Sequence, residues 1–273
     1  MKKYLISTAI LPKATGKHFY EYSSIPTVVK QLDIDGIEFV FLPEWDEISR
    51  PLTPTSADFN TIKKIGVHEV AEFIKASNIK AYSVHVNRDV GNYLCSNDDG
   101  LILRGKQILN ENLLGAKVLN AKLVVIHLWD TYNGVLDINK LHKMVYEVSK
   151  QYSFKITYEN IPISDNTLSN YKVWKKLYDF MPENYGFTLD LNWCSFNNDF
   201  DKLITFIDKI YNIHVQGYFD NNVLKPRFGN LDLLSCLKTL KEHNYNNFIT
   251  LELSKVSNIN ECITAINLIR ENL

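Results

Sequence analysis

The run Leu123-Val124-Val125-Ile126 is apolar on both faces and is followed directly by His127. A strand with one face in water alternates apolar and polar residues, whereas a parallel strand covered by helices is apolar throughout. Helix-like spacing precedes this run over Leu101–Leu119 and follows it over Ile138–Gln151. The sequence from 101 to 151 therefore predicts a helix, a buried parallel strand and a second helix.

The same alternation continues in both directions along the chain. The strand that contains the run 123–126 is predicted over Leu123–Leu128. The other strand-like runs are Tyr4–Ile10, Gly36–Phe41, Lys80–Val86, Lys155–Glu159, Tyr185–Leu189, Ile210–Val215 and Phe248–Leu253. The other helix-like segments are Ile25–Leu32, Ile62–Ser77, Leu168–Phe180, Phe200–Ile207, Leu231–His243 and Ile259–Ile269. Eight strand–helix units in 273 residues, without a Pro/Gly/Ser-rich linker, predict a single (β/α)8 TIM barrel over residues 1–273.

A doubly wound sheet is the alternative α/β fold, but its Gly-rich first turn is missing. The first predicted turn, residues 11–16, contains no G-x-G-x-x-G pattern. The longest connections without helix or strand spacing are Leu42–Thr61 and Asn87–Gly100. Both follow predicted strands, so in a barrel both would lie on the face where active sites are built.

Composition excludes several classes of protein. Hydrophobic residues make up 45% and charged residues 22%, which is typical of a globular chain. The net charge of −1 gives no indication of a nucleic-acid-binding surface, and no apolar run reaches the roughly 20 residues of a membrane span. Four widely separated cysteines and a start without a signal-peptide pattern lead us to expect a cytoplasmic protein.

Acidic residues and histidines stand in or at the end of seven of the eight predicted strands. They are Glu38, His85, His127, Glu159, Asp190, His214 and Glu252. Chemistry in a barrel is located at the C-terminal ends of the strands, so we expect these side chains to converge. The only Lys or Arg that we find in these strand ends is Lys155, at the opposite end of its strand. Several carboxylates without a positive side chain between them indicate a bound cation.

The chemistry of the converging groups restricts the choice of cation. Glu159, Asp190, His214 and Glu252 combine three carboxylates with one imidazole, which suits a divalent ion such as Mn²⁺, Zn²⁺, Co²⁺ or Mg²⁺. His85 and His127 either add a second ion that shares Glu159 or bind substrate and orient the carboxylates. The residues alone leave these two interpretations open.

The order Glu159, Asp190, His214, Glu252 on the last four predicted strands resembles the xylose isomerase-like TIM-barrel superfamily. This superfamily contains sugar and sugar-phosphate isomerases and epimerases, inosose dehydratases and apurinic endonucleases of the endonuclease IV type. The spacing of the four residues is close to that of the keto-sugar 3-epimerase branch. The loop Phe228–Asp232 also resembles the G-x-G-x-(I/L)-D loop of the family.

The resemblance implies a metal-dependent isomerase or epimerase that acts on a small sugar, sugar phosphate or polyol through an enediolate. Glu159 and Glu252 would exchange the proton next to the substrate carbonyl, while Asp190 and His214 would only hold the ion. Trp193 would stack on an apolar face of the sugar, and Glu38 and Arg227 would bind substrate hydroxyls or a phosphate. We expect a small carbohydrate-like partner and no membrane, and we leave a homo-oligomer open.

Three positions depart from the family pattern. Trp193 stands where the family commonly has a histidine, three residues after Asp190. Gln216-Gly217 replaces an acidic residue that often follows the strand histidine, and Arg227 replaces the first glycine of the G-x-G loop. The predicted metal ligands are therefore intact, whereas the residues predicted to surround the substrate are altered.

Two other functions remain to be distinguished. An endonuclease IV-like phosphodiesterase acting on abasic DNA is supported by His85 and His127, which that branch uses for another zinc. Trp193, the absence of D-x-H after His214 and the net charge of −1 oppose it, so nucleic acid is not the expected partner. A non-catalytic metal-binding paralogue is the third hypothesis, and the intact pair Glu159 and Glu252 argues against it.

Overall fold

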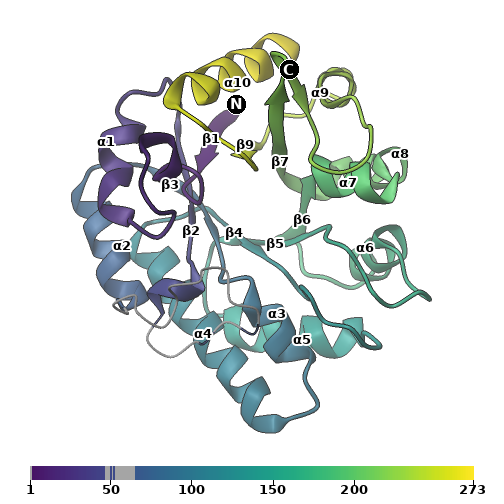
Figure 1. The fold of residues 1–273 in the computed structure, drawn as a ribbon. Coiled ribbons are helices and arrows are strands. Elements are labelled where there is room, and N and C mark those ends of the chain that lie inside the picture. The colour runs from purple at the N-terminus through teal and green to yellow at the C-terminus, as the bar shows by residue number, and fades with distance from the viewer. Residues whose placement is uncertain (1, 47–49, 51, 53–64) are drawn as a thin grey trace.

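The computed structural model of the chain describes residues 2–46, 50, 52 and 65–273. Eight parallel strands pair side by side in a closed ring: β1 (Lys3–Ser7), β2 (Gly36–Val40), β3 (Ala81–His85), β4 (Leu123–Ile126), β5 (Lys155–Glu159), β6 (Tyr185–Asp190), β7 (Ile210–Asp220) and β9 (Phe248–Leu253). Pairing of β6 with β7, β7 with β9 and β9 with β1 completes the ring, which Figure 1 shows from one end. The predicted (β/α)8 TIM barrel is confirmed.

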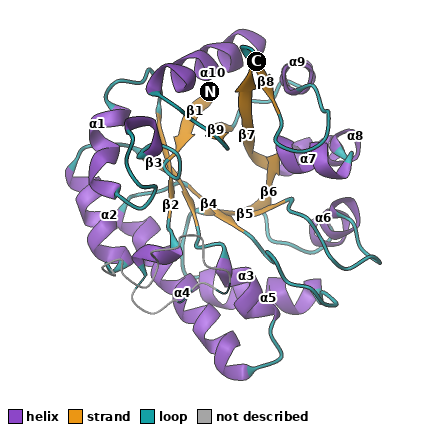
Figure 2. Ribbon diagram, in the orientation of Figure 1, coloured by secondary structure: helices purple, strands orange, loops and turns teal. Residues whose placement is uncertain are grey.

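Helices surround the ring on its outer side (Figure 2). They are α1 (Ile25–Val29), α2 (Val67–Ala76), α4 (Asp99–Val118), α5 (Ile138–Ser149), α6 (Asn170–Tyr178), α8 (Phe200–Leu203), α9 (Leu233–Glu242) and α10 (Ile259–Asn272). A helix is present in each of the eight predicted segments, although residues 62–64 of the second one lie outside the described residues. The sixth, predicted over Phe200–Ile207, is α-helical only over Phe200–Leu203 and continues as a 3₁₀ helix over Ile204–Lys209. None of the helices in the described part of the chain is long and apolar enough to cross a membrane.

Two helices and one strand were not predicted: α3 (Asp89–Cys95), α7 (Leu191–Asn197) and β8 (Val223–Lys225). Helix α3 lies in the segment 87–100 that lacked helical spacing, because nearly the whole short helix is buried. Strand β8 pairs antiparallel with the end of β7 through Asn221 and Asn222. Both asparagines have positive φ, 50° and 64°, which a tight two-residue hairpin turn requires. The other predicted loop, Leu42–Thr61, lies largely outside the described residues.

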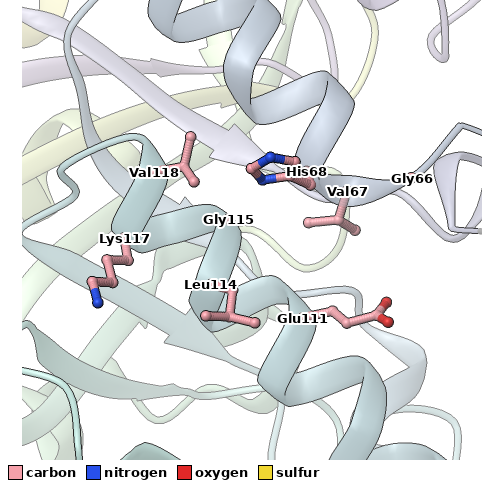
Figure 3. Close-up of a pocket in the computed structure, with 8 residues that line it drawn as sticks. All are labelled: Gly66, Val67, His68, Glu111, Leu114, Gly115, Lys117 and Val118. Atoms are coloured by element: carbon pink, nitrogen blue, oxygen red, sulfur yellow. The ribbon is translucent and has the colours of Figure 1, made fainter.

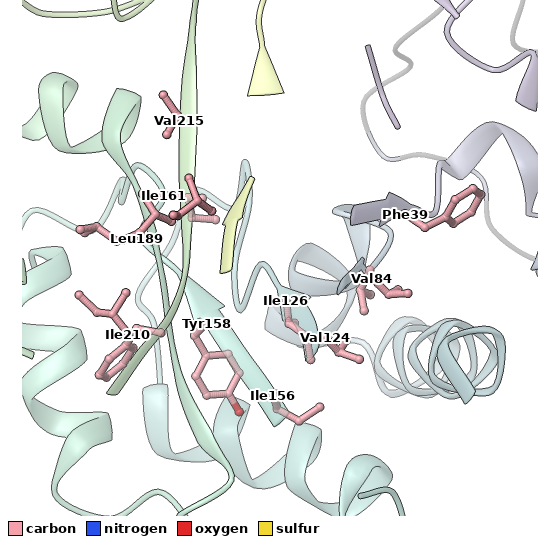
Figure 4. Close-up of a cluster of buried hydrophobic side chains, with 14 of the residues drawn as sticks. Phe39, Val84, Val124, Ile126, Ile156, Tyr158, Ile161, Leu189, Ile210 and Val215 are labelled. Atoms are coloured by element: carbon pink, nitrogen blue, oxygen red, sulfur yellow. The ribbon is translucent and has the colours of Figure 1, made fainter. Parts of the chain in front are cut away.

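The apolar core lies between the ring and the helices. Val84, Val124, Ile156 and Leu189 are among its fully buried strand residues (Figure 4). Leu123 and Val125, the alternate residues of β4, belong instead to a second small cluster with Tyr211 and Phe248. The run that is apolar on both faces therefore packs on both faces, which is why its pattern predicted a covered strand.

Buried polar side chains occupy the interior towards the C-terminal ends of the strands. They bond to one another across neighbouring strands: Thr157 Oγ1 lies 2.7 Å from Thr188 Oγ1, and Thr250 Oγ1 donates to Asn212 Oδ1 at 3.0 Å. Polar groups cut off from water need such partners. This polar layer lies directly below the residues that we predicted to form the site.

Candidate metal centre at the barrel mouth

Strand register brings the predicted ligands together. Glu159 and Asp190 are the last residues of β5 and β6, Asp190 pairs with His214, and Glu252 pairs with Gln216. Ligand atoms of Glu159, Asp190 and His214 all lie within 4.8 Å of one another. His214 Nδ1 is 3.3 Å from Glu159 Oε1 and 3.5 Å from Glu252 Oε2. All four side chains therefore face one region at the C-terminal mouth of the barrel.

Several buried atoms at this point have no hydrogen-bond partner among the described residues, and they include both ring nitrogens of His214 and one oxygen each of Asp190 and Glu38. One carboxylate oxygen of Asp190, Oδ1, accepts the Trp193 backbone N–H at 2.7 Å, but the other, Oδ2, has no partner. His214 Nδ1 also makes no hydrogen bond. Burying unsatisfied polar atoms is unfavourable unless another group reaches them. A divalent cation between carboxylate oxygens and an imidazole nitrogen would satisfy them, so these residues fit a metal ion.

Glu252 is the most open of the four side chains. Its side chain is 20% exposed, against 3% for Glu159 and 0% for His214. It lies outside the tight group formed by the other three, yet both Glu159 and Glu252 line the cavity at the mouth. A molecule in that cavity can therefore contact both carboxylates.

Burial and neighbouring charges push the pKa values of these carboxyls apart. Burial alone would raise the pKa of Glu159, but the imidazoles of His214 and His127 hold it well below its usual range. Burial raises the pKa of Glu252, and the Glu159 charge adds to this while His214 opposes it. Burial and the charge of Glu159 likewise raise the pKa of Asp190. Glu159 is thus the carboxyl that most readily carries a negative charge.

A second group of ligand-type side chains shares Glu159. The Nε2 atoms of His85 and His127 lie 3.2 Å and 3.1 Å from Glu159 Oε2. His85 Nδ1 donates to the Val86 carbonyl at 2.8 Å, which turns Nε2 towards Glu159. Although burial opposes it, the hydrogen bond and charge of Glu159 raise the pKa of His85 to about 9. This geometry accommodates either a second ion or a cationic imidazole that faces substrate, so both interpretations stay open.

Glu38 lies behind His214. Its Oε1 is 2.9 Å from His214 Nε2, while its Oε2 accepts hydrogen bonds from Ser83 Oγ at 2.7 Å and Asn212 Nδ2 at 2.9 Å. The side chain is fully buried and is not part of the cavity lining. This placement differs from the expected contact with substrate hydroxyls, because both oxygens of Glu38 face protein groups. It fits a residue that orients the histidine.

Trp193 and Arg227 both line the cavity, as their predicted contact with substrate requires. The cavity has a volume of about 370 Å³, which is within the range of small-molecule sites. The Trp193 ring stacks on Phe228 with centroids 5.5 Å apart, and the Arg227 guanidinium lies 4.9 Å from the centroid of the same ring. The Arg227 backbone N–H donates to Asn192 Oδ1 at 2.8 Å, which ties its loop to α7.

Sequence reasoning missed several residues that line the cavity from loops and turns. They are Lys13, Phe19, Glu44, Arg88 and Asp130. Arg88 adds a positive side chain to the mouth from beyond the strand ends, because it lies three residues after β3. Its Nε lies 3.8 Å from Asp130 Oδ2 and 3.9 Å from Asp89 Oδ1, and no ion pair joins it to Glu159 or Glu252 among the described residues. Closeness of Arg88 to the end of its strand is the only signal that could have identified it.

A larger cavity of about 660 Å³ lies on the outside of the barrel, between α2 and α4 (Figure 3). Its lining is Gly66, Val67, His68, Glu111, Leu114, Gly115, Lys117 and Val118. In the described part of the chain, the groups of side chains suited to a metal ion lie at the barrel mouth and not here. The mouth is therefore the better candidate for chemistry despite its smaller volume.

Comparisons with known proteins agree with this fold. The sequence profile of the xylose isomerase-like TIM barrel matches residues 26–272. An uncharacterized protein of Methanocaldococcus jannaschii is 26% identical over 186 residues, or 61% of this chain and 61% of that protein. The alignment thus spans about three fifths of the relative's own length.

Three solved structures share the fold over nearly all of this chain. A D-allulose 3-epimerase from Methylomonas sp. has a TM-score of 0.72 and 14% identity, with coverage of 99% of this chain and 97% of that chain. A 3-keto-D-glucoside 4-epimerase from E. coli has a TM-score of 0.65 and 14% identity, covering 99% and 100%. An L-ribulose 3-epimerase has a TM-score of 0.66 and 16% identity, covering 98% and 86%. At identities this low, the structural similarity shows the fold alone.

Proposed function

The chain belongs to the xylose isomerase-like TIM-barrel family, and we propose that it is a divalent-metal-dependent isomerase or epimerase of a small sugar, polyol or sugar derivative. One observation carries the proposal: Glu159, Asp190, His214 and Glu252 converge at the mouth, and both glutamates border the cavity. The sugar epimerases among the structures of the same fold support this class of substrate.

Glu159, Asp190, His214 and Glu252 would hold the cation. When bound, the cation supplies stabilisation of the negative charge that develops on a substrate oxygen as the neighbouring C–H proton leaves. Asp190 and His214 are not among the residues that line the cavity, so their role is limited to holding the ion.

Proton transfer falls to the two glutamates. Glu159, whose pKa is lowered, is ionised and able to accept the proton α to the substrate carbonyl. Glu252, whose pKa is raised, can return a proton from the other side. Return to the opposite face of the same carbon gives an epimer, and return to the neighbouring carbon gives an aldose–ketose isomer.

Metal analysis combined with solvent exchange tests this proposal. Protein purified without chelators should contain about one divalent cation per chain. In D₂O it should place deuterium on the carbon next to the carbonyl of at least one ketose in a panel, as followed by NMR. Glu159→Gln and Glu252→Gln should lower this exchange, and Glu242→Gln, at an exposed position on α9, serves as their matched control. A protein that binds no divalent cation would overturn the proposal.

A second candidate, an endonuclease IV-like phosphodiesterase, rests on the group formed by His85, His127 and Glu159. Two or three zinc ions per chain together with cleavage of abasic-site DNA would favour it. The net charge of −1 is unfavourable for binding a polyanion. A protein that binds one cation and exchanges no ketose proton would instead favour the non-catalytic paralogue.

A further inference from the structure

We infer that the mouth of the barrel binds an anionic group of the substrate, a phosphate ester or a carboxylate, between Lys13 and Arg227. This inference rests on the proposed function and narrows its substrate class. Both side chains line the same cavity as Glu159 and Glu252. They reach it from opposite ends of the sequence, Lys13 from the turn after β1 and Arg227 from the loop after β8.

Lys13 and Arg227 share an unusual environment. Neither forms an ion pair with a carboxylate of the described residues, whereas Arg88, the third cation of the lining, lies near Asp89 and Asp130. Each rests instead on an aromatic ring: Lys13 Nζ is 5.5 Å from the centroid of Phe19, and the Arg227 guanidinium is 4.9 Å from that of Phe228. A ring face holds a cation in place without neutralising it. Both charges thus stay available to a bound anion.

The backbone beneath each cation is fixed. Lys13 begins a 3₁₀ turn that ends at Gly16, whose φ of 73° allows its N–H to bond the Lys13 carbonyl. Asn192 Oδ1 accepts the backbone N–H groups of both Arg227 and Phe228, at 2.8 Å and 3.1 Å. Binding an anion between two cations on a fixed backbone loses less conformational entropy than binding it to cations on flexible loops.

The position of the pair sets the shape of the ligand. Glu159 and His214 lie buried in the barrel, while Lys13 and Arg227 are exposed at the opening of the cavity. A ligand that spans the two regions carries its reacting carbonyl at one end and its anion at the other. Ketose phosphates and keto-uronates have this layout, and guanidinium and ammonium groups are the side chains that bind phosphate and carboxylate.

Equilibrium binding of three compounds with one carbon skeleton tests the inference. D-Fructose, D-fructose 6-phosphate and D-fructuronate carry a hydroxyl, a phosphate ester and a carboxylate at the same carbon. We expect at least one anionic compound to bind tenfold or more tightly than D-fructose, and the preferred one identifies the anion. Lys13→Gln and Arg227→Gln should each lower this ratio of affinities about tenfold or more, and Arg227→Lys should restore part of it.

Lys17→Gln provides the control, because Lys17 is an exposed lysine four residues after Lys13 that does not line the cavity. Equal affinities for all three compounds would overturn the inference, and so would an equal loss in Lys17→Gln. Deuterium exchange separates the two proposals. Deuterium exchange into D-fructose, with no tighter binding of either anionic compound, would support the proposed function and refute the anion site. Tight, Lys13- and Arg227-dependent anion binding without exchange into any ketose would support the site and refute the function.

Discussion

The floor and the rim of the barrel mouth are built in different ways. We define the floor as Glu38, Glu159, Asp190, His214 and Glu252, and the rim as Lys13, Arg88, Trp193 and Arg227. The floor residues stand on strands, and Glu252 alone among them is more than 3% exposed. The rim residues stand on turns, loops and a short helix, and their side chains reach solvent. Sheet register fixes the floor, whereas each loop places its own part of the rim.

This difference predicts two kinds of response to mutation. A floor residue is held by a hydrogen-bond network in which each group has few alternatives, as the two contacts to Glu38 Oε2 illustrate. Changes there should weaken metal binding or slow the chemistry by large factors. Changes in the rim should shift the choice of substrate by smaller factors.

The largest effect is expected for the two floor glutamates that border the cavity. Glu159→Gln and Glu252→Gln should each lower the rate of deuterium exchange into substrate by roughly 10²–10⁴, since a carboxamide cannot exchange a proton. Metal content, measured in the same preparations, shows whether the cation is still bound. Turnover near that of the Glu242→Gln control in either variant would remove that glutamate from proton transfer.

The floor could be predicted from the sequence because its residues interrupt apolar strands. Glu159 ends a run that is otherwise strand-like, and Asp190 does the same one unit later. Parallel strands end at one edge of the sheet, so chain order alone predicted that these groups converge. The role of Glu38 was not predictable in this way. Its distance to His214 depends on which strands face each other across the barrel.

The rim could be predicted only where the family pattern marks a position. Trp193 and Arg227 were singled out because they replace family residues, and both line the cavity. Lys13 and Arg88 occupy loops without a periodic pattern, so nothing in the sequence set them apart from other surface cations. Helix α7 was missed for a similar reason: its seven residues are too few to show a helical period.

A buried polar pair outside the barrel shows what burial does to the pKa of a histidine that has no carboxylate beside it. His142 on α5 places its Nδ1 atom 2.9 Å from the hydroxyl of Tyr158. Tyr158 precedes Glu159 in the sequence, but its side chain faces α5. Burial lowers the pKa of His142 to about 4. In the unfolded chain His142 binds a proton below about pH 6.5, whereas in the folded protein it stays neutral down to about pH 4. The stability that neutral His142 contributes is therefore fully present above pH 6.5 and is lost as the pH falls towards 4. The loss has an upper limit of about 3 kcal/mol.

Chemical denaturation across that pH range measures this loss. The free energy of unfolding of wild type should fall relative to that of His142→Gln between pH 6.5 and 4, while metal affinity at neutral pH stays unchanged. His243→Gln, at the exposed end of α9, is the matched control. A difference between wild type and His142→Gln that does not vary with pH would show that the histidine is not held neutral.

A smaller effect is expected at Glu38, the floor residue that contacts His214 and does not border the cavity. Its Oε1 lies 2.9 Å from His214 Nε2, and this contact turns Nδ1 towards Glu159 and Glu252, where it can bind a cation. Glu38→Gln should weaken metal binding by roughly 10–100-fold, as loss of such a partner typically does. Competition with a metal-sensitive dye measures this affinity. An unchanged affinity would place Glu38 among the merely structural polar residues of the barrel interior.

The smallest effect is expected at Trp193, where the rim departs from the family pattern. Its backbone N–H donates to Oδ1 of Asp190, the N-cap residue of α7, and its ring fills the side of the cavity against Phe228. An indole donates one hydrogen bond and presents a flat apolar face, but it cannot bind a cation or take up a proton. We therefore expect weak activity on free keto-hexoses, and a several-fold gain for Trp193→His on these sugars. Steady-state kinetics of both proteins across a ketose panel checks this. Robust wild-type epimerisation of a free keto-hexose that falls in Trp193→His would show that the tryptophan itself makes the productive contact, and the rim would then contribute to chemistry as directly as the floor does.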